Sequence, residues 1–114
     1  MPYESGTLLL VAYPFTDRTA AKQRPVLVVS AKRFNRGEDF VGLPVSSRII
    51  PDDPHGVVIL DTDKHFPLTK LRRSSTVKWT KPMTLSSRVV VKKLGKVPPE
   101  ILEEIQTRVR SLFS

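Results

Sequence analysis

The sequence has no cysteine and only two histidines, His55 and His65. Without thiols, a disulfide scaffold, a thiolate zinc site and a cysteine nucleophile are excluded. Two imidazoles are also too few for a histidine-rich metal site. The five glycines are scattered and form no phosphate-binding loop. We therefore expect a site that uses no metal and no cofactor.

Long hydrophobic runs are also missing. The longest apolar run, Leu8–Tyr13, is far shorter than the roughly 20 residues that span a bilayer. Glu4 precedes this run and no small-residue cleavage site follows it, so we expect no signal peptide, no membrane contact and a cytoplasmic location. A chain of 114 residues predicts a single domain, residues 1–114.

Acidic residues are absent from residues 64–96, and the chain as a whole has a net charge of +8. This segment contains ten basic residues: Lys64, Lys70, Arg72, Arg73, Lys78, Lys81, Arg88, Lys92, Lys93 and Lys96. Solvated surfaces usually mix charges of both signs. The segment therefore favours a polyanionic partner, nucleic acid first and an acidic protein second, over a merely solvated basic face.

Short apolar segments separated by turn-forming residues predict a mainly β fold. The predicted strands cover residues 7–13, 25–29, 40–46, 57–60, 75–79 and 88–92. The first of them is continuously apolar, which predicts burial on both faces. Residues 35–38 predict a turn, residues 84–87 a short turn or half-helix, and residues 65–73 are ambiguous.

The last element is a predicted helix of about 15 residues that follows Pro98 and Pro99. Its apolar residues recur at helical spacing: Ile101, Leu102, Ile105, Val109, Leu112 and Phe113. We expect this stripe to pack on the sheet, which gives a small barrel with a helical cap. The aromatic residues Phe40, Trp79 and Phe113 are predicted to lie in the core.

The residues contain no familiar hydrolytic arrangement, and the Asp52–Asp53 pair is interpreted as turn charges. A basic protein can nevertheless cleave RNA, because the 2′-hydroxyl of RNA attacks the adjacent phosphate. The protein then needs only to orient the chain and stabilise the phosphorane, for which arginine is well suited. Arg24, just before Pro25, and the strand-end serines Ser46 and Ser47 are candidates, with an ordinary structural role as the alternative.

The order of the motifs resembles the MazF/PemK (Kid) toxin family. The resemblance covers nearly the whole chain and is carried by residues 6–11, 14–17, 24–30, 34–36, 43–47, 75–77, 81–85 and 94–97 and by the terminal helix. Its most specific part is the strand–loop–Arg-Pro–strand opening around Arg24.

This resemblance implies an SH3-like barrel of five to seven strands with a C-terminal α-helix, assembled as a homodimer. It also implies the toxin of a type II toxin–antitoxin system, acting as a sequence-specific, metal-independent endoribonuclease (mRNA interferase) on single-stranded RNA. The implied protein partner is an acidic MazE-like antitoxin whose tail fills the basic RNA groove.

The resemblance assigns roles to individual residues. Arg24 matches the catalytic arginine, and Ser46 matches the catalytic threonine while keeping its hydroxyl. The expected RNA-binding residues are Phe15, Thr19, Lys22, Ser47, Arg48, Lys78, Thr80 and Lys81. Thr19 stands where some members have glutamate, and Thr80 where one branch has aspartate. No general base is therefore identified, and a slow enzyme is expected.

Two other functions remain open on the sequence. A CcdB-like gyrase inhibitor shares the implied fold, but residues 110–114 lack the tryptophan that this activity uses. A non-catalytic SH3-like module would bind RNA or DNA with a strong salt dependence and leave it intact.

Overall fold

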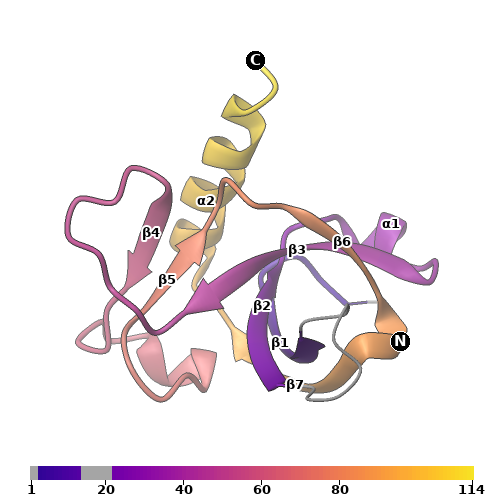
Figure 1. Cartoon of the computed structure of the whole chain (residues 1–114), viewed down its shortest axis with the longest axis horizontal. Coiled ribbons are helices and arrows are strands. Elements are labelled where there is room, and N and C mark those ends of the chain that lie inside the picture. Colours follow the sequence, from indigo (N-terminus) through magenta and orange to yellow (C-terminus); the bar gives the residue numbers. More distant parts are fainter. Residues whose placement is uncertain (1–2, 14–21) are drawn as a thin grey trace.

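A computed structural model describes residues 3–13 and 22–114, without the side chain of Tyr13 (Figure 1). The strands are β1 (Thr7–Tyr13), β2 (Lys22–Val28), β3 (Asp39–Ser46), β4 (Gly56–Ile59), β5 (Ser75–Lys78), β6 (Met83–Ser86) and β7 (Val90–Lys96). The helices are α1 (Lys32–Asn35), the 3₁₀ helices η1 (Phe66–Thr69) and η2 (Ser87–Val89), and α2 (Pro99–Ser111).

The strands form one antiparallel arrangement in the order β4-β5-β3-β2-β1-β7, and β6 pairs with β3. The sheet is strongly curved and α2 lies beside it (Figure 1). The prediction of a mainly β fold of five to seven strands with a C-terminal helix is confirmed. Among the described helices, none is long and apolar enough to cross a membrane.

The central strands bury side chains on both faces, as predicted for the first strand. Leu8 belongs to one buried cluster, whereas Leu9 and Val11 belong to the other. On β2, Leu27 joins the first cluster, and its neighbours Val26 and Val28 join the second. Since strand side chains alternate between faces, a continuously apolar strand fits a sheet covered on both sides.

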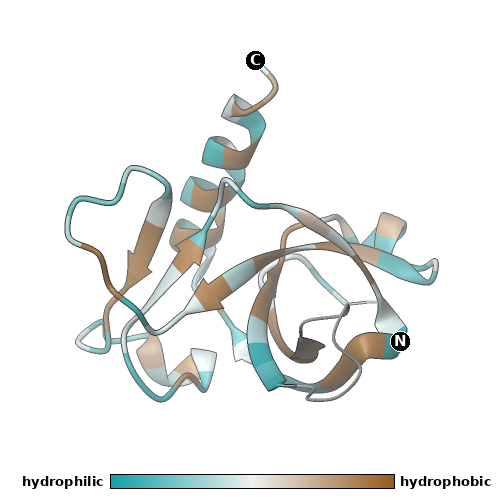
Figure 2. Cartoon of the chain, in the orientation of Figure 1, coloured by the Kyte–Doolittle hydropathy of each residue, from teal (hydrophilic) through white to brown (hydrophobic). Residues whose placement is uncertain are grey.

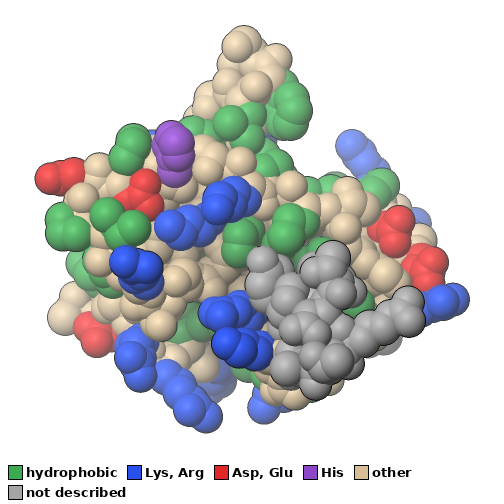
Figure 3. All heavy atoms as spheres, in the orientation of Figure 1, with side chains coloured by type: hydrophobic (Ala, Val, Ile, Leu, Met, Phe, Trp, Pro, Cys, Tyr) green, Lys and Arg blue, Asp and Glu red, His purple; other side chains and the backbone are tan. Residues whose placement is uncertain are grey.

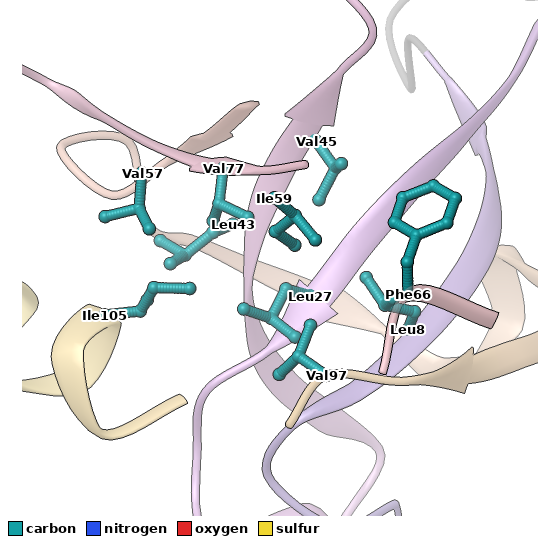
Figure 4. Close-up of a cluster of buried hydrophobic side chains, with 10 residues drawn as sticks. All are labelled: Leu8, Leu27, Leu43, Val45, Val57, Ile59, Phe66, Val77, Val97 and Ile105. Atoms are coloured by element: carbon teal, nitrogen blue, oxygen red, sulfur yellow. The ribbon is translucent and has the colours of Figure 1, made fainter. Parts of the chain in front are cut away.

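The first cluster lies between the sheet and α2 (Figure 4). Ile105 is completely buried there and is the part of the predicted helical stripe that contributes most to the core. Figure 2 shows α2 in both brown and teal, in agreement with an amphipathic helix. Glu100 in the first turn and Arg108 and Arg110 in the last suit the helix dipole.

Three sequence predictions are wrong in whole or in part. The strand predicted over residues 88–92 begins only at Val90, because residues 88 and 89 belong to η2, and it continues as β7 to Lys96. Residues 84–87 are not a turn or half-helix, because most of them belong to β6, which pairs with residues 39–42 of β3 and buries Leu85. Phe113 is not a core residue: α2 ends at Ser111, and the Phe113 side chain is 81% exposed. The predicted core position of Phe40 is confirmed, and Trp79 packs partly buried against the first cluster.

Gly95 is the point at which β7 approaches η1. A Cβ atom added at Gly95 would lie 2.2 Å from the carbonyl oxygen of Leu68 and 2.8 Å from that of Thr69. Both neighbours are backbone atoms and cannot rotate away. The glycine therefore allows β7 to lie directly against the C-terminal end of η1.

We predict that Gly95→Ala lowers the free energy of unfolding by about 1–3 kcal/mol, the usual cost of overpacking. Gly37→Ala is the matched control, because its added Cβ would meet only the Phe34 carbonyl oxygen, at 3.7 Å. Urea denaturation of the three proteins checks this. Equal midpoints for both variants would contradict the close approach at Gly95.

Candidate nucleic-acid interface

Arg24 and Ser46 lie on neighbouring strands, at the end of the sheet where the chain leaves the core. β2 and β3 pair antiparallel with Val26 opposite Pro44. If this register is continued for two more residues along each strand, Arg24 lies opposite Ser46. The first three residues of β2 are exposed and the last three are buried, so Arg24 extends beyond the core while its strand stays anchored in it. Both residues line the same two cavities.

The larger cavity has a volume of about 760 Å³ and is strongly basic. Besides Arg24, it is lined by five cations that come from the η1–β5 loop and from β7: Lys70, Arg72, Arg73, Lys92 and Lys93. Ser46, Ser47 and Gln23 add polar groups. Figure 3 shows Lys and Arg side chains gathered on the face of the molecule that Figure 1 presents.

The smaller cavity, of about 300 Å³, lies on the other side of the Arg24–Ser46 rim. Lys78 and Lys81 line it together with five apolar residues: Pro25, Val26, Pro44, Val45 and Met83. The rim therefore separates a basic cleft from a more apolar pocket. No described carboxylate or histidine lines either cavity.

The Ser46 hydroxyl is held in place by the backbone. The Arg48 backbone N–H donates a hydrogen bond to Ser46 Oγ at 3.1 Å. The Thr76 hydroxyl in turn donates to the Arg48 carbonyl oxygen at 3.3 Å, and Thr76 is buried on β5. Within the described part of the chain, no group accepts a hydrogen bond from the Ser46 hydroxyl. Its hydrogen can therefore point toward a ligand in the cleft.

The other predicted RNA contacts are divided between several places. Ser47 lines the larger cavity, and Lys78 and Lys81 line the smaller one. Lys22, Arg48 and Thr80 line neither cavity, although Arg48 supports Ser46 through its backbone. Phe15 and Thr19 lie outside the described residues. The sequence does not single out the five cations of the larger cavity, but all five belong to its acid-free segment.

Lys78, one of the predicted RNA contacts, forms an ion pair with an acidic residue. Its Nζ lies 3.5 Å from Oδ2 of Asp53 in the β3–β4 loop. The His55 backbone N–H donates to Asp53 Oδ1 at 2.9 Å. This hydrogen bond is the main cause that lowers the pKa of Asp53 below its ordinary value of 3.8, and the charge of Lys78 adds to it.

The protein is a small antiparallel β protein, and its cationic cleft is a surface that attracts polyanions. The family model for the PemK-like, MazF-like toxin of type II toxin-antitoxin system matches residues 4–113. The chain therefore belongs to this family of toxins.

Similar solved structures agree on the fold. The MazE-MazF complex (Form-III) from Deinococcus radiodurans superposes with a TM-score of 0.77 at 23% identity, covering 99% of this chain and 97% of that chain. An endoribonuclease in complex with its cognate antitoxin from Mycobacterial species gives a TM-score of 0.73 at 19% identity, covering 98% and 93%. A search of the curated proteins returned no match.

The lowered pKa of Asp53 predicts a pH effect on stability. A carboxylate with a depressed pKa in the folded state stabilises the protein above its ordinary pKa, and this contribution is lost as pH falls through the folded-state value. Asp53→Asn keeps an acceptor for the His55 N–H but removes the charge. We expect urea unfolding to lose less stability between pH 5 and pH 2 in this variant than in the wild type; identical losses would contradict the assignment.

Proposed function

We propose that this toxin is a metal-independent, sequence-specific endoribonuclease that cleaves single-stranded mRNA by attack of the RNA 2′-hydroxyl. The observation that carries the proposal is the shared rim of Arg24 and Ser46 between a basic cleft and a more apolar pocket. A single strand lying across this rim places one phosphate beside both side chains. Two similar solved structures, each of an endoribonuclease from Mycobacterial species, support the same activity.

The two rim residues have complementary roles in this reaction. When the 2′-oxygen attacks phosphorus, the bond to the 5′-oxygen breaks and a 2′,3′-cyclic phosphate forms. The Arg24 guanidinium stabilises the negative charge of the phosphorane, since it remains ionised and its planar fork matches two phosphate oxygens. The Ser46 hydroxyl donates a hydrogen bond to a non-bridging oxygen, while its own oxygen is fixed by the Arg48 N–H.

Among its described residues, the site lacks an identified group that takes the proton from the 2′-hydroxyl. Because no described carboxylate or histidine lines the cavities, the proposal assigns no carboxylate base. In the proposed reaction, solvent water takes the proton of the 2′-hydroxyl and returns a proton to the leaving 5′-oxygen, while Arg24 stays ionised and acts through hydrogen bonds. General acid–base catalysis usually contributes about 10²–10⁴ in rate, so we expect a slow enzyme.

Cleavage of a long RNA in EDTA, with the ends mapped, tests the proposal. We expect Arg24→Ala to reduce kcat by about 10²–10³, the usual loss when one transition-state donor is removed. Ser46→Ala should cause a smaller loss, and Ser46→Thr should restore activity. Arg33→Ala, which removes an exposed arginine of α1 outside both cavities, is the matched control. Intact RNA after incubation with folded wild type would leave a non-catalytic RNA-binding module as the function.

The proposal includes two protein partners and a cytoplasmic location. The first partner is an acidic MazE-like antitoxin, supported by the charge of the cleft and by the MazE-MazF complexes among the similar structures. The second is another copy of this chain. The C-terminal end of α2 projects from the body of the molecule (Figure 1) and leaves Leu112 42% and Phe113 81% exposed. A homodimer that covers this end would bury both side chains.

We predict that Phe113→Ser weakens the homodimer by at least about tenfold, because buried aromatic side chains often dominate interface energies. Phe34→Ser is the matched control: Phe34 on α1 is also more than half exposed. Sedimentation velocity over a range of concentrations measures the dissociation constant. A monomeric wild type, or an equal effect of the two substitutions, would contradict this interface.

A further inference from the structure

We propose that the η1–β5 loop and β7 form a preformed wall that binds RNA phosphates on one side only of the scissile bond. We call Lys70, Arg72, Arg73, Lys92 and Lys93 the phosphate wall. The inference rests on the proposed function, because it takes Arg24 and Ser46 as the cleavage point. It adds the path that the RNA follows away from that point.

The phosphate wall is strongly cationic. Its five cations come from two segments about twenty residues apart, yet all line one cavity that contains no described acidic residue. Four ion pairs form between described residues, and none of them involves these five cations. Besides Arg24 of the rim, only two described cations, Lys78 and Lys81, line the smaller cavity, and Asp53 already neutralises part of the charge of Lys78. The cations of the wall therefore remain available for an anionic ligand.

The backbone beneath these side chains is fixed. The buried Thr69 hydroxyl donates to the Phe66 carbonyl oxygen at 2.7 Å and accepts from the Leu71 N–H at 3.1 Å. Lys70 has the left-handed backbone conformation, with φ of 59°. The close approach at Gly95 fixes this loop against β7. A loop ordered in this way before binding loses little conformational entropy when the ligand arrives.

The pairing of β7 with β1 is irregular. The register shifts between Leu8 and Leu9 and again between Leu10 and Val11, on either side of the segment opposite Lys92 and Lys93. Such bulges bend a strand and change the direction of its side chains. Lys92 and Lys93 themselves pair with consecutive residues of β1, and the extra residues of the two irregularities are their neighbours Val91 and Leu94. The lysine pair is thus held between two irregularities, and both lysines line the larger cavity.

The two sides of the rim therefore suit different parts of a nucleotide chain. The wall has several cations in a cavity of about 760 Å³, which suits successive phosphates. The smaller pocket of about 300 Å³ has apolar side chains and suits a base. An RNA strand crossing the rim consequently gains electrostatic affinity mainly from nucleotides on the side of the wall.

The test measures binding of single-stranded RNA that carries a 2′-deoxy nucleotide at the mapped cleavage site. The variants are Lys92→Ala/Lys93→Ala and Arg72→Ala/Arg73→Ala, with Arg33→Ala/Arg36→Ala as the control that removes two exposed cations outside both cavities. Each phosphate contact contributes about 0.7 to the slope of log K against log salt. We expect each wall variant to reduce this slope by about 1.4 and the control to leave it nearly unchanged.

A second measurement separates the wall from general electrostatic attraction. The RNA is lengthened by three nucleotides on either the 5′ or the 3′ side of the cleavage site. For the wild type, we expect one of these extensions to raise affinity much more than the other, and this gain should disappear in the wall variants. In multiple-turnover assays, the wall variants should raise KM several-fold with kcat little changed, whereas Arg24→Ala lowers kcat.

The outcomes distinguish this inference from the proposed function. Two results would contradict the inference while the wild type still cleaves RNA. In the first, both extensions raise the affinity equally; in the second, the control lowers the salt slope as much as the wall variants do. If the wall variants bind RNA as the wild type does but lose affinity for an acidic peptide, the inference is also contradicted, and the wall is instead a surface for the antitoxin. If the wild type cleaves no RNA, the proposed function fails, and the salt slopes on an unmodified single strand still decide on the wall.

Discussion

Burial of the central sheet on both faces is the constraint on which the rest of this structure depends. Leu8, Leu9, Leu27 and Val28 divide between two clusters on opposite sides, so the middles of β1 and β2 have no room for polar side chains. Functional groups can then occur only where strands extend beyond the core. The rim of Arg24 and Ser46 lies at such a place, with a rigid apolar strand behind each residue. A polar pair held in this way is positioned by the core without being part of it.

The cationic cleft has a different origin, because its residues follow no strand periodicity. They are brought together by contacts between backbone segments: β7 lies against η1 at Gly95, and the Thr69 hydroxyl orders the loop that follows. The electrostatic surface thus depends on a few local packing details rather than on the main core. Under the proposed function, this separation lets binding and chemistry be altered independently, since the wall would act on KM and the rim on kcat.

The sequence predicts the order of the strands and of the last helix well, because short apolar segments between turn-forming residues and the Pro98–Pro99 helix start are strong local signals. It also identifies Arg24 and Ser46, which the structure brings to one rim. It fails at residues 84–87, where a polar segment becomes a strand only through pairing with β3. It fails at Phe113 because helical spacing does not show where a helix ends. The grouping of Lys70 with Lys92 depends on tertiary contact and has no local signal.

Arg24 lies on an exposed extension of a buried strand, and this position bears on how mutation could inactivate the toxin. A substitution there removes a side chain that contributes nothing to the two hydrophobic clusters. Under the proposed function, such a substitution removes the residue that stabilises the phosphorane and leaves both hydrophobic clusters intact. Any acidic partner that recognises the remaining cations would go on binding the harmless form. Under the proposed function, an inactive copy of this kind would compete with the active toxin for the same acidic partner.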